Sequence, residues 1–143
     1  MANKFALIGC GARGRAYMRQ LAGELENGYE LAAIADPSSE AINRFIELYK
    51  LKNVSIFTDG PELIKQMGNQ LDGVIIASPN AFHLASLLPA LEDKMVILLE
   101  KPVAITLEDC KTMWEAYKNS EGAAILVGFV LRYTPFYSKV KEI

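Results

Sequence analysis

The chain has few of the residues that bind metals or form disulfides, and it has no long apolar run. Its 143 residues include two cysteines and one histidine. Cys10 and Cys110 lie far apart and lack metal-ligand spacing, so we expect no metal site and a reduced, cytoplasmic setting. The longest apolar run, residues 123–131, is far shorter than a bilayer span and contains Gly128.

Strong charge of either sign is also missing. The net charge is -2, and the lysines and arginines are scattered along the chain. A nucleic-acid surface or a polybasic membrane contact would need these cations in clusters. The chain starts without a basic stretch followed by an apolar one, so we expect no signal peptide. We therefore expect neither a nucleic acid nor a membrane as partner.

What the sequence does contain is a regular alternation of short apolar segments and helical patterns. Its length suits one domain, and 51% of its residues are hydrophobic. The apolar segments are continuous and rich in Ile, Leu, Val and Ala, which is typical of strands buried on both faces of a parallel sheet. The predicted strands are residues 5–8, 31–35, 54–57, 73–77, 96–99 and 124–127.

Between these strands, apolar residues recur at helical spacing and predict four helices. Pro89 is expected to kink the third helix or to mark its first turn. The fourth begins at Thr106, which with Asp109 resembles a capping box, and Cys110 is expected in the core. The four apolar faces are Tyr17, Leu21 and Leu25; Ile42, Phe45, Ile46 and Tyr49; Leu84, Leu87, Leu88 and Leu91; and Leu107, Cys110, Met113, Trp114 and Tyr117.

This order of strands and helices predicts an α/β fold with a doubly wound, mostly parallel sheet. The expected architecture is a three-layer α/β/α Rossmann domain with strand order 3-2-1-4-5-6. We assign it residues 1–133. Thr134 and Pro135 then read as the N-cap and first position of another helix.

A glycine-rich loop connects the first predicted strand to the first helix. Gly9 permits a tight turn, Gly11 lets the backbone approach a diphosphate, and Gly14 lets the helix and the strand pack closely. Backbone N–H groups of Ala12 and Arg13 at the helix start would meet the phosphate charge. In this context a turn without a ligand is the weaker interpretation. Cys10 is interpreted as a small side chain that packs under the cofactor.

Asp36 ends the second predicted strand and favours NAD as the cofactor. A carboxylate there accepts both hydroxyls of the adenine ribose and repels a 2′-phosphate. Arg13 and Arg44 keep NADP open, because an arginine near that ribose could accommodate the phosphate. Methyltransferases also have a glycine loop and an acid at the end of the second strand, so the loop alone leaves both ligands open.

Two later segments, which follow the fourth and fifth predicted strands, decide between these ligands, and a third after the sixth strand adds to the resemblance described below. Open α/β sheets bind ligands at these carboxyl ends. The order and context of the segments resemble the glucose–fructose oxidoreductase/inositol dehydrogenase family, and they argue against a methyltransferase. The segments are Ser78-Pro79-Asn80-Ala81-Phe82-His83, Glu100-Lys101-Pro102 and Gly128-Phe129-Val130-Leu131-Arg132-Tyr133-Thr134-Pro135.

The resemblance implies hydride transfer between NAD and a secondary alcohol of a sugar, a cyclitol or a related compound. Lys101 would then be catalytic, polarising the reacting oxygen beside the nicotinamide; the alternative is a solvated Glu100–Lys101 pair. The resemblance also makes Pro102 a candidate cis proline. In the family a glycine usually occupies the turn before the fifth strand, where this chain has Lys94.

The remaining site residues each have a second interpretation. Ser78, Pro79 and Asn80 would border the nicotinamide and its ribose, while Asn80 could simply cap the following helix. His83 is interpreted as an orienting or packing group rather than a base. Arg132 would approach the site from the last strand or would lie on the surface.

The family resemblance implies a second α/β domain that supplies the substrate pocket. Phe136, Val140 and Ile143 form a new apolar face in residues 134–143, which suggests the start of a helix leading to that absent domain, or one that docks here. We expect this chain to bind NAD without turnover, and the full-length protein to bind a small-molecule substrate and form homo-oligomers. A redox-neutral NAD-dependent glycosidase and a non-catalytic dinucleotide-binding module remain alternatives.

Overall fold

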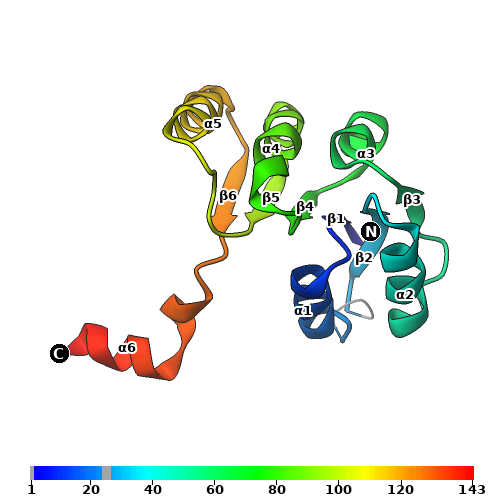
Figure 1. The fold of residues 1–143 in the computed structure, drawn as a ribbon, viewed down its shortest axis with the longest axis horizontal. Helices are drawn as coiled ribbons and strands as arrows, with labels where there is room; N and C mark the ends of the chain where they lie inside the picture. Colours follow the sequence, from blue (N-terminus) through cyan, green and yellow to red (C-terminus); the bar gives the residue numbers. More distant parts are fainter. Residues whose placement is uncertain (1, 24–26) are drawn as a thin grey trace.

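The computed structural model describes residues 2–23 and 27–143, and its centre is a single parallel sheet. The strands run in the order β3-β2-β1-β4-β5-β6, and every pairing is parallel (Figure 1). This confirms the predicted Rossmann fold and strand order. The strands are β1 (Asn3–Ile8), β2 (Tyr29–Ala35), β3 (Ser55–Phe57), β4 (Gly73–Ile76), β5 (Val96–Leu99) and β6 (Ala124–Val127).

Helices cover both faces of the sheet, as Figure 1 shows. Three short 3-10 helices accompany them: η1 (Gly68–Gln70), η2 (Asn80–Phe82) and η3 (Val130–Tyr133). The α-helices are α1 (Ala12–Leu21), α2 (Ser39–Tyr49), α3 (Gly60–Met67), α4 (His83–Glu92), α5 (Leu107–Asn119) and α6 (Pro135–Glu142).

The core consists of two apolar clusters, one on each face of the sheet. On one face, Met18 of α1 and Phe45 of α2 pack against the strands. On the other, Leu63 of α3, Leu87 of α4 and Met113 of α5 do the same. Strands enclosed in this way bury side chains on both faces, which explains why they read as continuous apolar runs.

Helix α3 was not among the predicted helices, although its start carries clear signals. The side chain of Asp59 accepts a hydrogen bond from the backbone N–H of Glu62 at 2.9 Å. Pro61 lies in the first turn, where its missing N–H costs nothing. The helix is short, and Leu63 and Ile64 are its fully buried side chains, so its apolar pattern is brief.

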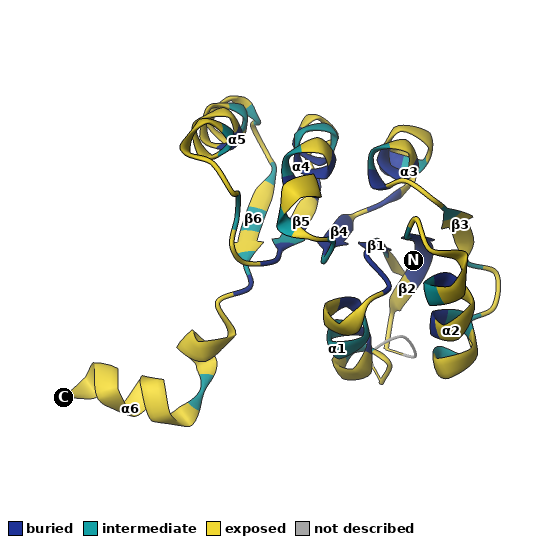
Figure 2. Cartoon of the chain, in the orientation of Figure 1, coloured by how far each residue is buried: buried dark blue, intermediate teal, exposed yellow. Residues whose placement is uncertain are grey.

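The predicted apolar face of α5 is buried only at Met113, and its other members are exposed. Cys110 is exposed rather than in the core, and Leu107 and Trp114 are 72% and 58% exposed. Met113 is the buried residue of this helix. Helix α5 is the last helix on its face of the sheet, with α4 on one side of it and no helix drawn on the other (Figure 2). Most of α5 therefore faces outward. At its start, Thr106 caps the helix through the N–H of Asp109 as predicted.

The structure also shows where Pro89 lies in α4 and how the turn before β5 is formed. Pro89 lies inside α4 near its end, so it does not mark the first turn. Lys94, which precedes β5, has φ 57, so this turn keeps a left-handed residue although it lacks glycine. A side chain in that conformation costs about 1 kcal/mol.

Helix α6 begins where the sequence predicted, but it does not dock on the domain. Thr134 and Pro135 occupy the N-cap and first helical positions, although the Thr134 hydroxyl donates to the carbonyl of Leu131 instead of capping. The side chains of Phe136 and Val140 are 70% and 53% exposed, and the helix projects away from the sheet (Figure 1). Leu25, predicted on the face of the first helix, lies outside the described residues.

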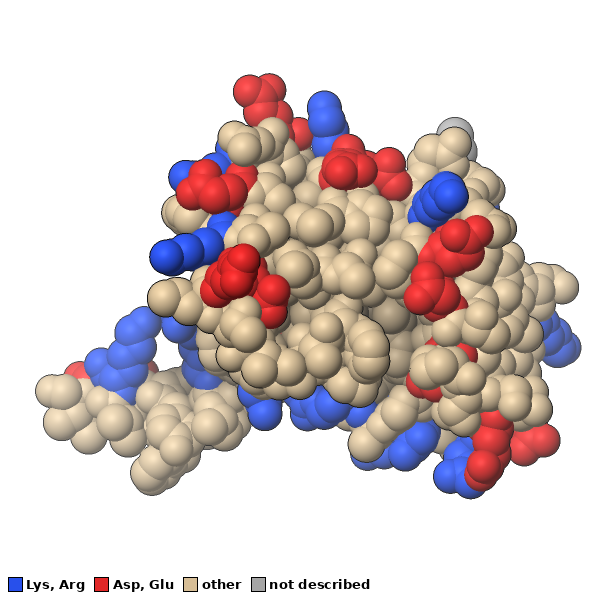
Figure 3. Space-filling view, turned by 45° about the horizontal axis from the view of Figure 1, so that its top comes forward, with Lys and Arg blue, Asp and Glu red and all other residues tan. Residues whose placement is uncertain are grey.

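The surface carries charges of both signs. On the face drawn in Figure 3, acidic and basic side chains lie around a broad area that has no charged side chain. Within residues 2–23 and 27–143, every helix is too short or too polar to cross a membrane.

Candidate functional site

The glycine loop turns tightly between β1 and α1, and each glycine meets a different steric demand. Gly9 has φ +100, and a Cβ on it would lie 2.7 Å from the backbone of Ala77 and Ser78. A Cβ on Gly14 would lie 1.9 Å from the carbonyl oxygen of Gly9. A Cβ on Gly11 would meet nothing within 4 Å. The fold itself therefore requires Gly9 and Gly14, whereas Gly11 leaves open space at the start of the helix.

That open space belongs to a pocket of about 630 Å³ at the carboxyl ends of the central strands. Residues 58–61, Phe82 and Ser86 also line it but were not predicted. Residues 58–61 follow β3 directly, so the rule that ligands bind at strand ends would have found them. The predicted site residues in its wall are Gly9, Gly11, Ala12, Arg13, Asp36, Ser78 and Pro79.

Asp36 is held in place by backbone donors on either side of it. The N–H of Cys10 donates to its Oδ2 at 2.8 Å, and the N–H of Ser38 donates to its Oδ1 at 2.9 Å. Burial and the negative charge of Asp36 raise the pKa of the Cys10 thiol to about 12. This buried thiol therefore stays protonated, which supports its interpretation as packing under the loop.

The residues of this pocket fit a dinucleotide. Among the described residues, the Ser78 hydroxyl is the buried side-chain polar atom without a hydrogen-bond partner, and Ser78 lines the pocket. Buried polar atoms normally have a hydrogen-bond partner, so a hydroxyl without one at a pocket wall is suited to hydrogen-bond an atom of a ligand. Gly11 adds room at a helix N-terminus, where phosphate charge is favourable, and Asp36 adds an acceptor for ribose hydroxyls.

A buried carboxylate, Glu100, connects the glycine loop to the segment after β5. Its Oε1 accepts hydrogen bonds from Nε of Arg13 at 2.9 Å, from a terminal nitrogen of the same guanidinium, and from the hydroxyl of Tyr17. Its Oε2 accepts the backbone N–H of Lys101 at 3.1 Å. Since Glu100 is 3% exposed and its side chain contacts Arg13 and Tyr17, the solvated Glu100–Lys101 pair is wrong.

These contacts shift the pKa values of all three side chains. Burial alone would raise the pKa of Glu100, but hydrogen bonds from Tyr17 and Arg13 and the guanidinium charge lower it below its ordinary value. Burial and the neighbouring carboxylate raise the pKa of Tyr17 to about 12. The hydrogen bond to Glu100 raises the pKa of Arg13. The network therefore holds one anion, one cation and one neutral phenol at neutral pH.

Arg13 and Arg44, the two arginines that could have accommodated the 2′-phosphate of NADP, are each paired with a carboxylate. Arg13 pairs with Glu100 at the end of β5, whereas Asp36 lies at the end of β2 on the other side of β1. Arg44 pairs with Glu40 at 2.8 Å on the exposed face of α2. In this arrangement neither guanidinium is held at the acidic end of β2.

His83 is buried between the two later segments. Its Nδ1 lies 3.1 Å from the carbonyl oxygen of Val103, and its Nε2 lies 3.0 Å from that of Ser78. The ring is 1% exposed and does not line the pocket. This geometry supports an orienting role. Asn80 starts η2 and its side chain caps neither η2 nor α4, so the capping interpretation is wrong.

The other predicted residues are not part of the wall of this pocket. Lys101 is exposed, and its bond to Pro102 is cis, as the resemblance suggested. Arg132 is exposed in η3. Gly14, Asn80, His83, Glu100, Lys101 and Arg132 are absent from the lining of the pocket described above.

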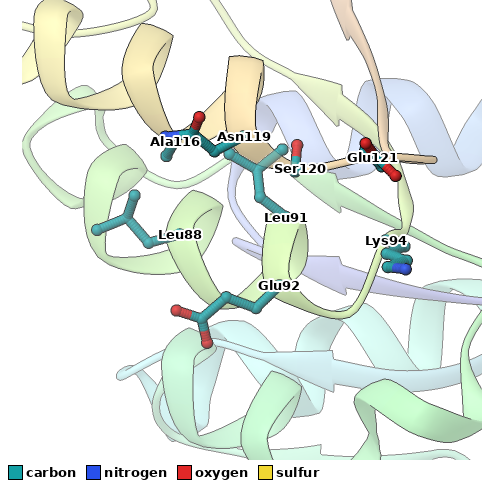
Figure 4. Close-up of a pocket in the computed structure, with 8 residues that line it drawn as sticks. All are labelled: Leu88, Leu91, Glu92, Lys94, Ala116, Asn119, Ser120 and Glu121. Carbon is teal, nitrogen blue, oxygen red and sulfur yellow. The ribbon is translucent and has the colours of Figure 1, made fainter.

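A second pocket of about 470 Å³ lies between the C-terminal ends of α4 and α5 (Figure 4). It is next to the turn before β5, at the opposite edge of the sheet from the glycine loop. Its charged residues are Glu92, Lys94 and Glu121, and it contains no predicted site residue. It therefore does not belong to the candidate cofactor site.

Comparisons with known proteins agree with an NAD-binding Rossmann domain. The family model GFO/IDH/MocA, described as an oxidoreductase family with an NAD-binding Rossmann fold, matches residues 3–129. An inositol 2-dehydrogenase/D-chiro-inositol 3-dehydrogenase of Halalkalibacterium halodurans is 30% identical over 142 residues, covering 99% of this chain and 40% of that protein. Its counterpart from Lacticaseibacillus casei is 32% identical over the same shares.

A solved structure of a related dehydrogenase has the same fold as this chain. The myo-inositol dehydrogenase of Lactobacillus casei, in complex with NAD(H) and myo-inositol, has a TM-score of 0.87 and 32% sequence identity. The match covers 99% of this chain and 41% of that one. The chain thus spans about 40% of the length of the relatives it matches.

The buried carboxylate generates a prediction about stability. Glu100→Gln should lower the free energy of unfolding at pH 7 by about 1.5–3 kcal/mol, the usual value of a hydrogen bond to a charged group. Because the folded-state pKa of Glu100 is lowered, its contribution is complete above the ordinary pKa of 4.5 and is lost as the pH falls through the folded value. Denaturant unfolding between pH 7 and pH 3 should show this gap closing in acid.

Glu40→Gln is the matched control, because it removes the exposed ion pair with Arg44. It should change the stability by no more than about 0.5 kcal/mol at any pH. A Glu100→Gln effect that is equally small, or one that persists unchanged to pH 3, would contradict the assignment of a charged, paired Glu100.

Proposed function

The chain belongs to the GFO/IDH/MocA oxidoreductase family, and we propose that it is the NAD-binding half of an enzyme that transfers hydride between a secondary alcohol and NAD. The observation that carries this proposal is the pocket at the carboxyl edge of the sheet, which combines the space beside Gly11 with Asp36 and the unpaired Ser78 hydroxyl. The location that we propose is cytoplasmic, which suits the two free cysteines.

Each part of the pocket has a proposed partner on the cofactor. The open space at Gly11 and the N–H groups at the start of α1 would receive the diphosphate. The Asp36 carboxylate would accept the hydroxyls of the adenine ribose, since its oxygens retain lone pairs beyond the two backbone contacts. Ser78 and Pro79 would border the nicotinamide side. His83 and Glu100 would support this wall from within.

Lys101 is the proposed catalytic residue. When bound, NAD accepts or donates the hydride, and the protein supplies orientation and proton transfer. The Lys101 side chain is exposed at the end of β5, so a substrate hydroxyl could reach it. Its amino group would hydrogen-bond the reacting oxygen, take the hydroxyl proton as hydride leaves the carbon, and return that proton in the reverse direction. Asn80 and Arg132 are proposed to lie along the same edge.

The substrate side is proposed from the relatives. Their names describe inositol dehydrogenases, and the chain spans about 40% of their length. We propose that residues 1–133 form the cofactor domain and that residues 134–143 lead into a second α/β domain. That domain would hold a sugar, a cyclitol or a related small molecule and would contribute to a homo-oligomer.

The cofactor pocket predicts a selective effect at Gly11. Gly11→Val should abolish NAD binding while leaving the thermal unfolding midpoint nearly unchanged, since a Cβ there meets no protein atom. Its φ of -71 and ψ of -160 suit any residue. Calorimetric titration with NAD measures the binding. Gly14→Val is the contrasting control and should lose the fold, because its Cβ would collide with the Gly9 carbonyl. Normal NAD binding by Gly11→Val would refute the phosphate cradle.

Cofactor preference gives a second test. NAD should bind more tightly than NADP, and Asp36→Ala should reduce this preference by about tenfold or more, the ratio expected when about 1.4 kcal/mol of discrimination is lost. Asp36→Asn separates charge from loop support, because it keeps an acceptor for the backbone N–H groups of Cys10 or Ser38. Titrating both cofactors into each form measures the ratio. An unchanged ratio in both variants would show that another residue selects the cofactor.

The proposed division between two domains predicts binding without turnover. The purified chain should bind NAD yet show no reduction of it with a panel of polyols and sugars, followed by absorbance. Correct positioning contributes about 7–11 kcal/mol to lowering an enzymatic barrier, and the exposed Lys101 of the cofactor domain would not supply it without the proposed second domain. Clear, saturable reduction would demonstrate a complete active site in these residues.

A further inference from the structure

The Glu100 network joins segments that are far apart in the sequence. Arg13 and Tyr17 come from α1, and their contacts with Glu100 span 87 and 83 residues. The same carboxylate accepts the backbone N–H of the next residue, Lys101. One buried side chain therefore connects the glycine loop with the segment that carries the proposed catalytic lysine.

Gly128 shows how closely this network is packed. A Cβ on Gly128 would lie 2.6 Å from the Tyr17 hydroxyl and 3.1 Å from Oε1 of Glu100. The absence of a side chain at the end of β6 therefore leaves room for the contact between Tyr17 and Glu100. Three strand ends or loops, after β1, β5 and β6, meet at this carboxylate.

Arg13 belongs to both the network and the pocket. Its Nε and one terminal nitrogen bind Glu100, yet its side chain is 44% exposed and lines the pocket. Within the described residues, no hydrogen bond occupies its other terminal nitrogen. A guanidinium fixed along one edge presents its remaining donors in a defined direction, which suits phosphate or ribose oxygens.

The sheet order determines which part of a dinucleotide Arg13 would meet. Asp36 lies at the end of β2 and Glu100 at the end of β5, on opposite sides of β1. Glu100 therefore pulls Arg13 away from the adenine-ribose end, toward the other half of the pocket. A contact made there depends on the diphosphate and the groups beyond it, and not on adenosine.

We propose that Glu100 is a positioning residue that acts on the cofactor through Arg13, holding its guanidinium toward the diphosphate and nicotinamide half while fixing the backbone at Lys101. This inference rests on the proposed function. It assigns Tyr17 the role of a second support, since its hydroxyl donates to the same carboxylate oxygen as Arg13. A purely structural ion pair would stabilise the domain without distinguishing between parts of the ligand.

The test measures dissociation constants for AMP, ADP-ribose and NAD with the wild-type chain, Glu100→Gln, Arg13→Ala and the double variant. Glu100→Gln should weaken NAD and ADP-ribose about tenfold, as for one misdirected charge-assisted hydrogen bond, and leave AMP within about twofold. In the Arg13→Ala background, Glu100→Gln should have no further effect, because residues that act through one contact are not additive.

Two controls keep the test independent of stability. Glu40→Gln removes the exposed Arg44 pair and should change none of the three constants. Tyr17→Phe removes a single hydroxyl and should shift NAD in the same direction by a smaller factor, so it replaces Glu100→Gln if that variant does not fold. Amide hydrogen exchange at Lys101 should quicken in Glu100→Gln, because its acceptor on Oε2 is lost or weakened.

The outcomes separate the two hypotheses. Equal weakening of AMP and NAD, or additive effects of Glu100→Gln and Arg13→Ala, would overturn the positioning role and leave a structural ion pair. Unchanged NAD affinity in both Glu100→Gln and Tyr17→Phe would overturn it as well. Failure of the wild-type chain to bind NAD would instead overturn the proposed function, and the positioning role with it.

Discussion

The site depends on the close approach of Gly9 to the backbone of Ala77 and Ser78. A Cβ would lie 2.7 Å from those atoms, so this contact exists because the first residue after β1 has no side chain. The approach places the glycine loop directly beside the segment after β4. Gly14 then packs against the Gly9 carbonyl and sets the start of α1 over the same edge. Space for a ligand remains where Gly11 faces no protein atom.

Charge is organised around this geometry by a second constraint, the burial of Glu100. A buried carboxylate is costly unless it is paired and hydrogen-bonded. Arg13 supplies the charge, and Tyr17 and the Lys101 backbone supply further donors. Because Arg13 is partly exposed, it brings a cationic group to the pocket wall. The buried Glu100 carboxylate neutralises most of this positive charge. Asp36 supplies the anionic counterpart at the other end.

The sequence predicts the strands of this molecule better than the buried faces of its helices. Strands β5 and β6 were predicted with their observed bounds, because each is a short continuous apolar run. On α5, helical spacing correctly grouped Leu107, Cys110 and Trp114 on one face, but periodicity does not say which face turns inward. The sheet ends beside this helix, so Met113 of the predicted face is buried while Leu107, Cys110 and Trp114 are exposed.

Long-range contacts explain what the sequence leaves out of the site. The Glu-Lys-Pro segment suggests a local pair between neighbours, whereas the observed partner of Glu100 lies 87 residues away. No pattern of adjacent residues reports such a contact. His83 differs, because its link to Ser78 is local while its link to Val103 depends on β4 and β5 being neighbours in the sheet. The orienting role could thus be predicted, but not the second segment that His83 orients.

The two halves of the carboxyl edge differ in how much of their surroundings this chain supplies. Around β1, β2 and β4 the strands are buried, and the pocket is formed by residues of the chain itself. Toward β6, Leu126, Phe129 and Leu131 are each more than half exposed, and Lys101 and Arg132 are exposed as well. The adenosine half of a dinucleotide would therefore meet a formed wall, and its reactive half an open one. In the proposed enzyme, a second domain would cover this open half, which would exclude water and strengthen the polar contacts of the lysine.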